Sequence, residues 1–420
     1  MILLFAIVLL FIVAAMAALA IDIVTIYTAR SEAQSAADGA ALAAARALAS
    51  SGMTSNPSIT LVPQAENLAF TVATQVATHN TVAGKSLSGS GLGPNCGQEI
   101  CIVFNNLDTS FGTNPRLTVQ VTRSDLPIFF ARIWGSAIVT VKATATAEAY
   151  NPSGAAVFNP PAKPVSLSCV KPWVLPNMAD STTKIFDENT GAIQNASSLV
   201  GQSVDAGKGG LSVTCSGNCN LAQSGQAWQY FPGDQTSFPA PTKALPQCSV
   251  GLSLPYQNSV AGCVQKPVSC GDNTVGNSNV DLDRASNATD ADAELAVDCL
   301  THSQNNFGDR IDPTLKAGEP FQFVAGNDNP VAAAQGKDVM VSDSLVTLPV
   351  VDVSPGANFP ANPVKVIGFV QLFLNPSGSA TPLDHVPATI INLAGCGKNA
   401  TGQPILGNGA SPVAVRLIAP

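Results

Sequence analysis

The sequence predicts an α+β protein. An N-terminal transmembrane helix continues into a stalk, a small α+β extracytoplasmic module follows, and a disulfide-containing, β-rich C-terminal region ends the chain. Three observations predict this architecture: an uninterrupted apolar run at the start, ten cysteines, and alternating apolar segments separated by Gly, Pro and Asn toward the end. At 420 residues the chain has room for two or three domains.

Residues 1–27 are expected to form the membrane-spanning helix. Every residue from Met1 to Ile21 is apolar, and the first charge is Asp22. A helix of roughly 20 residues spans about 30 Å of hydrocarbon. A cleaved signal peptide is the alternative, because a small-x-small triplet occupies 18–20. Signal peptides usually have an apolar core of about 7–15 residues behind basic residues, so we favour a retained anchor.

The helical pattern continues beyond the membrane. The Ala-rich stretch 29–49 contains no proline, and its single glycine is Gly39. Alanine has the highest helix propensity, and small side chains let helices approach closely. We therefore expect one long helix that begins in lipid and packs, as a stalk, against the domain that follows it.

Composition narrows the function classes. Only 11% of the residues are charged and the net charge is −8, so we exclude nucleic-acid binding, which needs basic patches. Arg30 and Arg46 follow the helix, which by the positive-inside rule weakly favours a cytoplasmic body. The even cysteine count favours an oxidising compartment. We expect a single-pass protein of the cytoplasmic membrane with an extracytoplasmic body.

The cysteines suggest disulfides. Cys96 and Cys101 are spaced to close a short hairpin, and Cys215 and Cys219 bracket another turn. The remaining six allow fifteen pairings, which stay open. Zinc ligation and free buried thiols are the alternatives, but Cys215 and Cys219 have no clear second C-x₂₋₄-C unit and no histidine pair near them in the sequence.

Composition divides the chain into segments. We expect a transmembrane helix at 1–27, a stalk and α+β module at 28–150, a Pro-rich linker at 151–165, a loop-rich cysteine-containing region at 166–330 and a β-rich region at 331–420. Helices are predicted at 63–78, 125–135 and 290–300, and a Gly/Ser-rich loop at 81–95. Strands are predicted at 99–104, 116–122, 138–149, 337–353, 364–374, 386–393 and 412–418.

Candidate chemical motifs are weak. Gly84-Lys85-Ser86 resembles the end of a phosphate loop but lacks the earlier glycine, so an exposed loop is favoured. Asp352-x-Ser354 resembles a metal-binding loop that lacks its second hydroxyl ligand. No nucleophile or zinc-protease motif occurs, so we expect no enzyme and no cofactor. An unrecognised extracytoplasmic hydrolase stays an alternative.

One acidic cluster supports a second alternative, an envelope module that binds calcium or a surface polymer. The cluster consists of Asp281, Asp283, Asp290, Asp292 and Glu294. Carboxylates bind calcium, but no glycine stands at the turn position of an EF-hand loop. The last three would also lie in the first turns of a helix, where negative charge is favoured anyway. We therefore expect no metal site.

The N-terminal segment resembles that of the TadG-like Flp (Tad) pilus-assembly family. That family runs from a membrane helix through an Asp, an aromatic, an Arg, a Gln and an Ala-Asp-Ala-Ala-Leu-Ala motif. The matching positions are Asp22, Tyr27, Arg30, Gln34, Asp38, Ala41 and Leu42. Segments 129–135 and 141–148 also resemble the family, so the resemblance covers about the first 150 residues. Val24 and Gly39 depart from the family pattern.

The resemblance implies assembly or anchoring of a Tad-type pilus or a related envelope machine. It implies the lipid bilayer and other pilus-assembly or envelope proteins as partners. Asp22 is then either an ordinary boundary residue or a contact with a partner helix. Larger family members carry a von Willebrand A domain, whose metal motif this chain lacks, so we do not expect adhesion by that mechanism.

Overall fold

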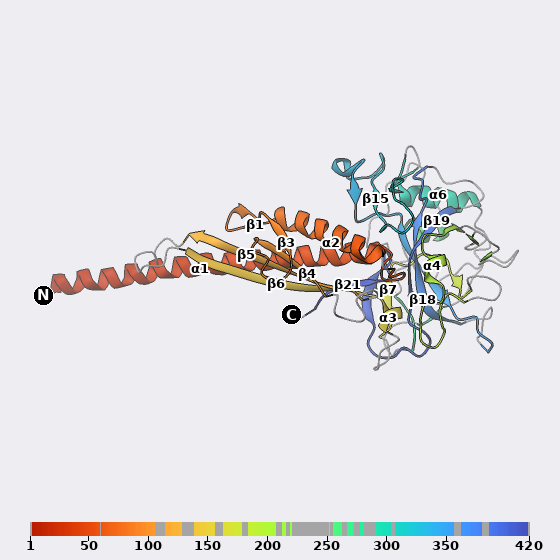
Figure 1. Ribbon diagram of the computed structural model, residues 1–420, viewed down its shortest axis with the longest axis horizontal. Helices are drawn as coiled ribbons and strands as arrows, with labels where there is room; N and C mark the ends of the chain where they lie inside the picture. The colour runs from red at the N-terminus through yellow and green to blue at the C-terminus, as the bar shows by residue number, and fades with distance from the viewer. Residues whose placement is uncertain are drawn as a thin grey trace.

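The computed structural model has a long rod that ends in a globular head (Figure 1). It describes residues 2–58, 60–105, 114–127, 138–155, 163–178, 184–206, 212–215, 219–220, 252, 255–262, 267–272, 278–280, 290–303, 307–356, 363–379 and 386–418. The N-terminus lies at the free end of the rod, whereas the C-terminal strand returns to lie beside the rod (Figure 1). We call residues 2–27 of the rod, which are mostly apolar, the apolar segment. The rest of the rod is the stalk, and the globular part is the head.

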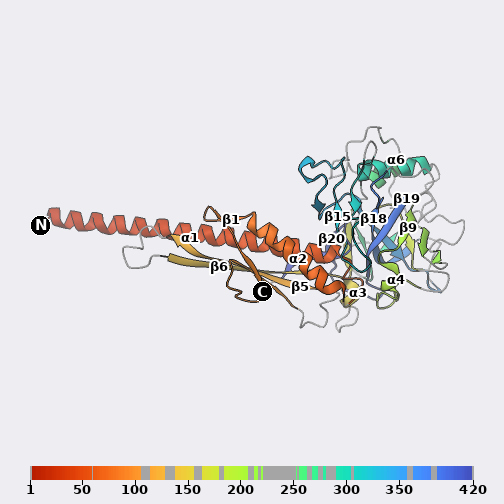
Figure 2. The same ribbon diagram turned by 45° about the horizontal axis from the view of Figure 1, so that its top comes forward.

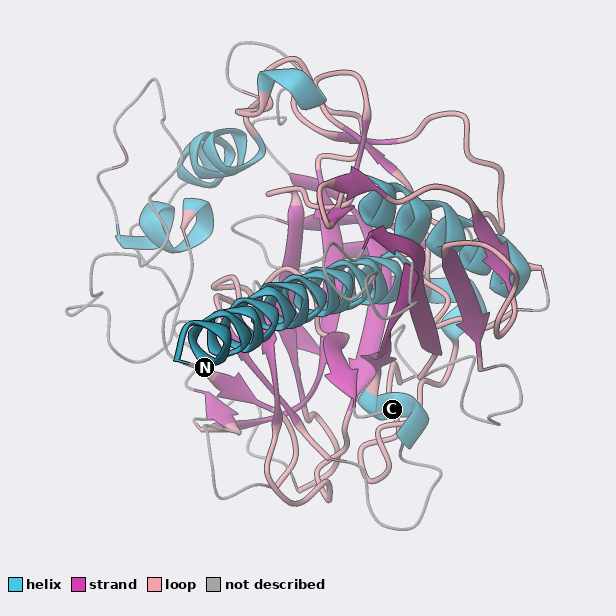
Figure 3. Cartoon of the chain, turned by 90° about the vertical axis from the view of Figure 1, so that its left-hand side faces the viewer, coloured by secondary structure: helices cyan, strands magenta, loops and turns pink. Residues whose placement is uncertain are grey.

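Helix α1 (Ile2–Ser50) runs the length of the rod without a break. At 1.5 Å per residue its 49 residues span about 73 Å. Its first half carries exposed apolar side chains, and its second half is the central element of the stalk. Figure 3, seen along the rod from the N-terminal end, shows α1 end-on in front of the strands. The expected long apolar N-terminal helix is confirmed.

The stalk is a five-stranded sheet with two helices packed on it. The sheet order is β21-β6-β5-β4-β3, and only the β3–β4 pair is parallel. Its strands are β3 (Ser90–Leu92), β4 (Ile100–Phe104), β5 (Arg116–Pro127), β6 (Ile138–Tyr150) and β21 (Ala414–Ile418). Helix α2 (Leu61–Thr78) confirms the helix predicted at 63–78 and lies alongside α1 (Figure 2).

Small side chains allow α1 to lie close to the sheet and to α2. The buried alanines of α1 include a stripe at the three- and four-residue spacing of one helix face: Ala29, Ala33, Ala36, Ala37, Ala40, Ala41, Ala44 and Ala45. Opposite them lie Ala143, Ala145, Ala147 and Ala149 of β6 and Ala65, Ala69, Ala73 and Ala77 of α2. The expected stalk packed on its own domain is therefore present.

The helix predicted at 125–135 is wrong where the structure describes it. Strand β5 continues to Pro127, and Leu126 and Pro127 pair with Val139 and Ile138 of β6. Asp125 does not cap a helix, because its carboxylate pairs with Arg123 and Lys85 instead. Residues 128–135 lie outside the described residues. Local cap-like residues were outweighed by the long cross-strand ladder.

The loop predicted at 81–95 also contains regular structure. Strands β1 (Thr81–Val82) and β2 (Lys85–Ser86) form a hairpin, and β3 follows. The two turn residues, Ala83 and Gly84, have φ values of 51° and 76°. A turn with two positive φ values joins antiparallel strands without splaying them, which explains the hairpin.

The head is built on an eight-stranded sheet. Along the sheet the order is β11 (Cys219–Asn220), β10 (Ser212–Cys215), β9 (Ser203–Ala206), β19 (Val386–Gly395), β18 (Val364–Leu374), β17 (Leu345–Val351) and β8 (Leu175–Pro176), and β13 (Asn279–Val280) also pairs with β18. Its long central strands are buried on both faces. The strand predicted at 337–353 is split between β17 and a separate short strand, β16 (Asp338–Val339).

Smaller elements complete the head. Strands β12 (Val268–Ser269), β7 (Val165–Ser168) and β20 (Ile405–Asn408) form one sheet, and β14 (Arg310–Ile311), β15 (Phe323–Val324) and β16 form another. The helices are α3 (Pro152–Ala155), α4 (Ala196–Leu199), α5 (Pro255–Ala261), α6 (Asp290–Thr301) and a 3-10 turn, η2 (Ala332–Ala334). Helix α6 confirms the helix predicted at 290–300.

Disulfides occur in both the stalk and the head. Cys96 bonds to Cys101 in the stalk, and Cys270 bonds to Cys396 in the head, with Cα–Cα distances of 5.5 and 6.0 Å. Cys169 and Cys299 are disulfide-bonded as well. In the β10–β11 hairpin, Cys215 lies directly opposite Cys219. The bond predicted from the Cys96–Cys101 spacing is confirmed, but it closes a loop rather than a hairpin, because the strands on either side of it, β3 and β4, are parallel.

Candidate functional site

The first candidate site is the apolar segment of α1. Its exposed large side chains are Leu3, Phe5, Ile7, Val8, Leu9, Leu10, Phe11, Ile12, Val13, Met16, Leu19, Ile21, Ile23 and Val24. This is the one described helix that is long and apolar enough to cross a membrane, with a mean hydropathy of 2.9 over its most apolar stretch. In water such a surface would be costly, whereas hydrocarbon accommodates it. The helix is consistent with a single-pass membrane anchor.

At the end of the apolar segment the environment of α1 changes. Asp22 is only 3% exposed, and its side chain interacts with another group of the protein. Tyr27 is 70% exposed, two residues before the alanine stripe begins at Ala29. An amphipathic ring of this kind is typical of the membrane–water interface. The chain thus leaves the apolar segment within about two helical turns.

Further along α1, the candidate residues divide between surface and core. Gln34 donates one hydrogen bond to Asp38 Oδ1 at 2.8 Å and another to the carbonyl of Thr144 at 3.2 Å. The second bond ties the helix to β6. Ala41 is buried and Leu42 half-buried, whereas Arg30 is exposed. The fold therefore gives Gln34, Asp38 and Ala41 a structural part inside the stalk. Whether the seven residues act together in assembly stays a prediction.

The second candidate site is the neck, which we define as residues 49–56 together with the strand that they contact, β19. Helix α1 ends at Ser50, and Gly52 turns the chain with a φ of 84°. A Cβ at this position would lie 3.0 Å from the Phe321 ring and 3.3 Å from the Ile391 carbonyl. The position therefore requires glycine on both conformational and steric grounds.

Asn392 of β19 lies at the centre of the neck. Its side chain is fully buried and donates to the Ala49 carbonyl and to Gln371 Oε1, both at 2.6 Å. Its Oδ1 accepts hydrogen bonds from Thr54 Oγ1 at 3.2 Å and from Ser55 Oγ at 3.1 Å. The end of helix α1 is thereby bonded to the central sheet of the head.

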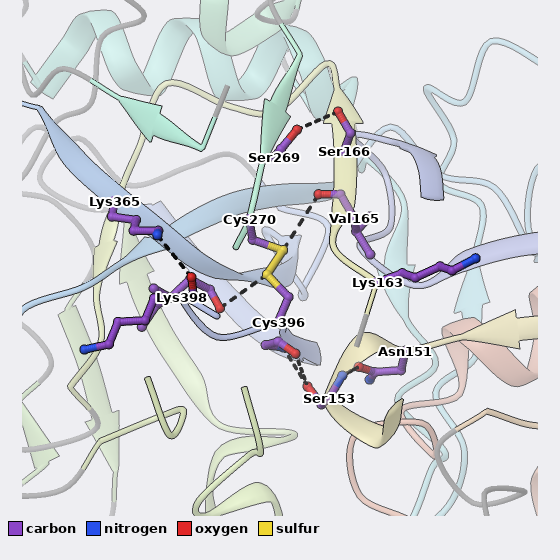
Figure 4. The surroundings of a disulfide bond; sticks show 12 residues. Asn151, Ser153, Lys163, Val165, Ser166, Ser269, Cys270, Lys365, Cys396 and Lys398 are labelled. Atoms are coloured by element: carbon purple, nitrogen blue, oxygen red, sulfur yellow. Dashed lines mark hydrogen bonds between the residues drawn. A yellow bond between two sulfur atoms is a disulfide. The ribbon is translucent and has the colours of Figure 1, made fainter. Parts of the chain in front are cut away.

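The neck also satisfies the backbone of β19 where β9 no longer covers it. Ser55 Oγ bonds to both the N–H and the carbonyl of Leu393, at 2.8 and 3.0 Å. Ser153 Oγ contacts the N–H and carbonyl of Gly395, beside the Cys270–Cys396 disulfide (Figure 4). Asn151 Nδ2 joins the Leu393 and Thr54 carbonyls at 2.9 and 3.1 Å. These side chains thus form the hydrogen bonds to the β19 backbone that a neighbouring strand would otherwise form.

A buried carboxylate connects the C-terminal strand, β21, to the rest of the stalk. Glu148 of β6 is buried and accepts hydrogen bonds from Arg116 of β5 at 3.0 Å and from Arg416 of β21 at 3.0 and 2.8 Å. The Arg416 guanidinium lies 5.4 Å above the ring centroid of Tyr150. Burial raises the pKa of Tyr150 to about 12. Strand β21, which follows the head in sequence, is therefore bonded to β6, which precedes the head.

The weak chemical motifs have structural explanations in the described residues. Lys85 pairs with Asp125 at 2.7 Å, and the Asp352 carboxylate accepts the Ser354 N–H at 2.9 Å. Asp292 accepts a hydrogen bond from Gln257 at 3.0 Å. Within the described ranges, no group of three or more potential metal ligands comes together. Asp281 and Asp283 lie outside those ranges, so the calcium alternative stays untested.

A comparison with protein families matches the anchor and the stalk half of α1. Residues 1–47 match the family described as "Putative Flp pilus-assembly TadE/G-like". The match contains all seven candidate positions and ends shortly before the neck. The resemblance over 48–150 stays a prediction. No curated protein and no solved structure matches this chain.

Sequence reasoning did not single out the neck residues. Asn392 and Gln371 stand inside otherwise apolar strands, β19 and β18, and both are fully buried. A lone amide within a strand that is buried on both faces was the available signal, because buried polar groups are almost always hydrogen-bonded. The partners of Asn392, Ala49 and Thr54, lie more than 300 residues away in sequence and gave no local indication.

Proposed function

We propose that this protein is a membrane-anchored, extracytoplasmic component that assembles or anchors a Tad-type (Flp) pilus or a related envelope machine. The observation that carries the proposal is the match of residues 1–47 to the Flp pilus-assembly TadE/G-like family, on a helix that is apolar and exposed at its start. The head has no counterpart in that match, so its contacts with other envelope proteins are part of the proposal.

The mechanism that we propose is mechanical rather than catalytic. A continuous helix joins the apolar segment to the neck, and the Asn392 network joins the neck to the head sheet. Buried, fully bonded side chains hold one geometry, because any alternative leaves polar groups unsatisfied. The head would thus stand at a fixed distance from the membrane and present its surface to partners.

Deletion of the gene tests the role in the pilus. We expect loss of piliation or surface adherence, restored by the full-length chain. Asn392→Ala removes the donor to the Ala49 carbonyl and to Gln371 Oε1, so it should reduce complementation while the protein remains in the membrane. The exposed Asn189→Ala is the matched control and should complement fully. Normal piliation in the deletion strain would contradict the proposal.

The side of the membrane needs its own test. An impermeant thiol reagent added to intact cells should label the protein only after a reductant has opened its disulfides. Labelling in intact cells without reductant, or labelling only after lysis, would contradict an oxidised extracytoplasmic body. The Cys96–Cys101 pair closes a loop at the stalk surface and is the first candidate to react.

A further inference from the structure

Among the residues that the structure describes, Arg46 is a cation without a partner in a region rich in hydrogen bonds. It lies on α1 one turn before the neck and is half-buried. Within the described part of the chain, no carboxylate or carbonyl accepts a hydrogen bond from its guanidinium. Burial without a counter-charge lowers its pKa below the usual value. A desolvated guanidinium with no partner is costly, so its position calls for an explanation.

The surroundings of Arg46 form a cavity. A cavity of about 560 Å³ lies between α1, β20 and β21, and Leu42, Ala43, Arg46 and Ser50 of α1 face it at helical spacing. Leu406 and Val341, which are 78% and 58% exposed, also line it. Among its described lining residues Arg46 alone carries a charge. The volume is in the range of pockets that hold small ligands.

A second cavity of about 750 Å³ adjoins the first and shares Arg46, Val341 and Asn408 with it. Its other cation, Lys171, is already used, because Nζ bonds to the carbonyls of Val260 at 2.7 Å and of Gly262. Asp343, which also lines the second cavity, pairs with His302 at 3.2 Å. Among the cationic side chains that line the two cavities in the described part of the chain, Arg46 is therefore the one whose hydrogen-bonding capacity is available to a ligand.

We propose that the cavity at the neck binds an apolar carboxylate, with the carboxylate on Arg46 and the apolar part against Leu42, Val341 and Leu406. A guanidinium matches the two oxygens of a carboxylate with parallel hydrogen bonds. Apolar walls favour a hydrocarbon body over a strongly hydrated anion such as phosphate. This chemistry is shared by a fatty acid and by a peptide chain that ends in an apolar residue. The site goes beyond the proposed anchoring role.

The test uses the full chain in lipid nanodiscs, with empty nanodiscs subtracted. The probes are octanoate and N-acetyl-Leu-Leu with a free carboxylate, and the controls are the two corresponding neutral amides. Binding is measured by calorimetric titration. We expect at least one carboxylate to bind saturably and its amide to bind about 10- to 100-fold more weakly, the loss expected for one charge-assisted hydrogen bond. Binding of octanoate but not of the peptide would identify the ligand as a fatty acid. Binding of the peptide but not of octanoate would identify it as the C-terminus of a peptide chain.

Two variants and one control complete the test. Arg46→Met should weaken binding by the same 10- to 100-fold while leaving the thermal midpoint unchanged or higher, because it removes a desolvated charge. Ala43→Phe should block the cavity and keep the cation. Lys316→Met removes an exposed cation outside the cavities and should bind normally. Equal affinity for acid and amide, normal binding by Arg46→Met, or no saturable binding of either carboxylate would overturn the proposal.

Discussion

The Glu148 carboxylate in β6 and the Arg416 guanidinium in β21 are joined by hydrogen bonds of 3.0 and 2.8 Å across 268 residues of sequence. Arg116 bonds to the other oxygen of the same carboxylate. The three residues lie directly opposite one another on adjacent strands, so backbone register and side-chain charge agree. The stalk therefore depends on a strand that is made after the head.

The first prediction concerns this arrangement. Arg416→Ala should lower the free energy of unfolding by about 1–2 kcal/mol, because the buried Glu148 keeps Arg116 as its partner. Glu148→Ala should cost more, since both arginines then lose their acceptor. The double variant should cost less than the sum, which a double-mutant cycle in denaturant unfolding measures. Strict additivity would contradict the coupling.

Two glycines of α1 and the neck are predicted to respond in opposite directions. Gly52→Ala should destabilise by about 1–2 kcal/mol or more, because alanine at a positive φ is strained and its Cβ would press on Phe321. Gly39→Ala should stabilise by about 1 kcal/mol from helix propensity, because its Cβ would make only an ordinary 3.8 Å contact with Val76. Thermal unfolding of both variants checks the contrast, and a stabilising Gly52→Ala would contradict it.

The Cys270–Cys396 and Cys96–Cys101 disulfides are predicted to differ in their effect on stability. Cys270–Cys396 spans 126 residues, and Cys96–Cys101 spans 5. Loop-closure entropy gives about 5 kcal/mol for the first and about 2 kcal/mol for the second. Replacing each pair by serines should therefore lower the unfolding free energy more in the head than in the stalk. The reverse order, measured in denaturant, would show that native-state contacts at these sites outweigh chain entropy.

The pKa of Tyr150 predicts a loss of stability at high pH. Because burial raises the folded pKa to about 12 from an unfolded value of about 10, the neutral phenol favours the fold. Its contribution, about 3 kcal/mol, is complete below pH 10 and is lost as the pH rises toward 12. Tyr150→Phe should remove this part of the pH dependence and lose the hydrogen bond to the Lys163 carbonyl. Parallel pH profiles of both proteins would contradict the assignment.

Local patterns in the sequence predicted the elements whose causes are local. The Ala-rich, proline-free stretch 29–49 predicted the stalk helix, and the apolar segment 364–374 between turn residues predicted β18 with its observed bounds. The helix expected at 125–135 failed because Asp125 and Pro127 look like cap residues, while the ladder that extends β5 depends on β6. Propensity signals cannot weigh such pairing.

The sequence pattern could not reveal contacts between residues that lie far apart in the chain. The contact of Asn392 with Ala49 links positions 343 residues apart, and β21 pairs with β6 from the far end of the chain. Nothing in either segment specifies its partner, because hydrogen-bond capacity is common to every polar residue. The cavity around Arg46 was equally inaccessible, since it exists only where α1, β20 and β21 converge.

The position of β21 sets an order of events during biogenesis. Residues 414–418 leave the ribosome after the head, so until then the edge of β6 at 146–150 offers unpaired backbone groups. A nascent or prematurely terminated chain would expose this strand edge, and unpaired strand edges make incompletely folded proteins prone to aggregate. The stalk sheet can therefore be completed only after the head has been synthesised.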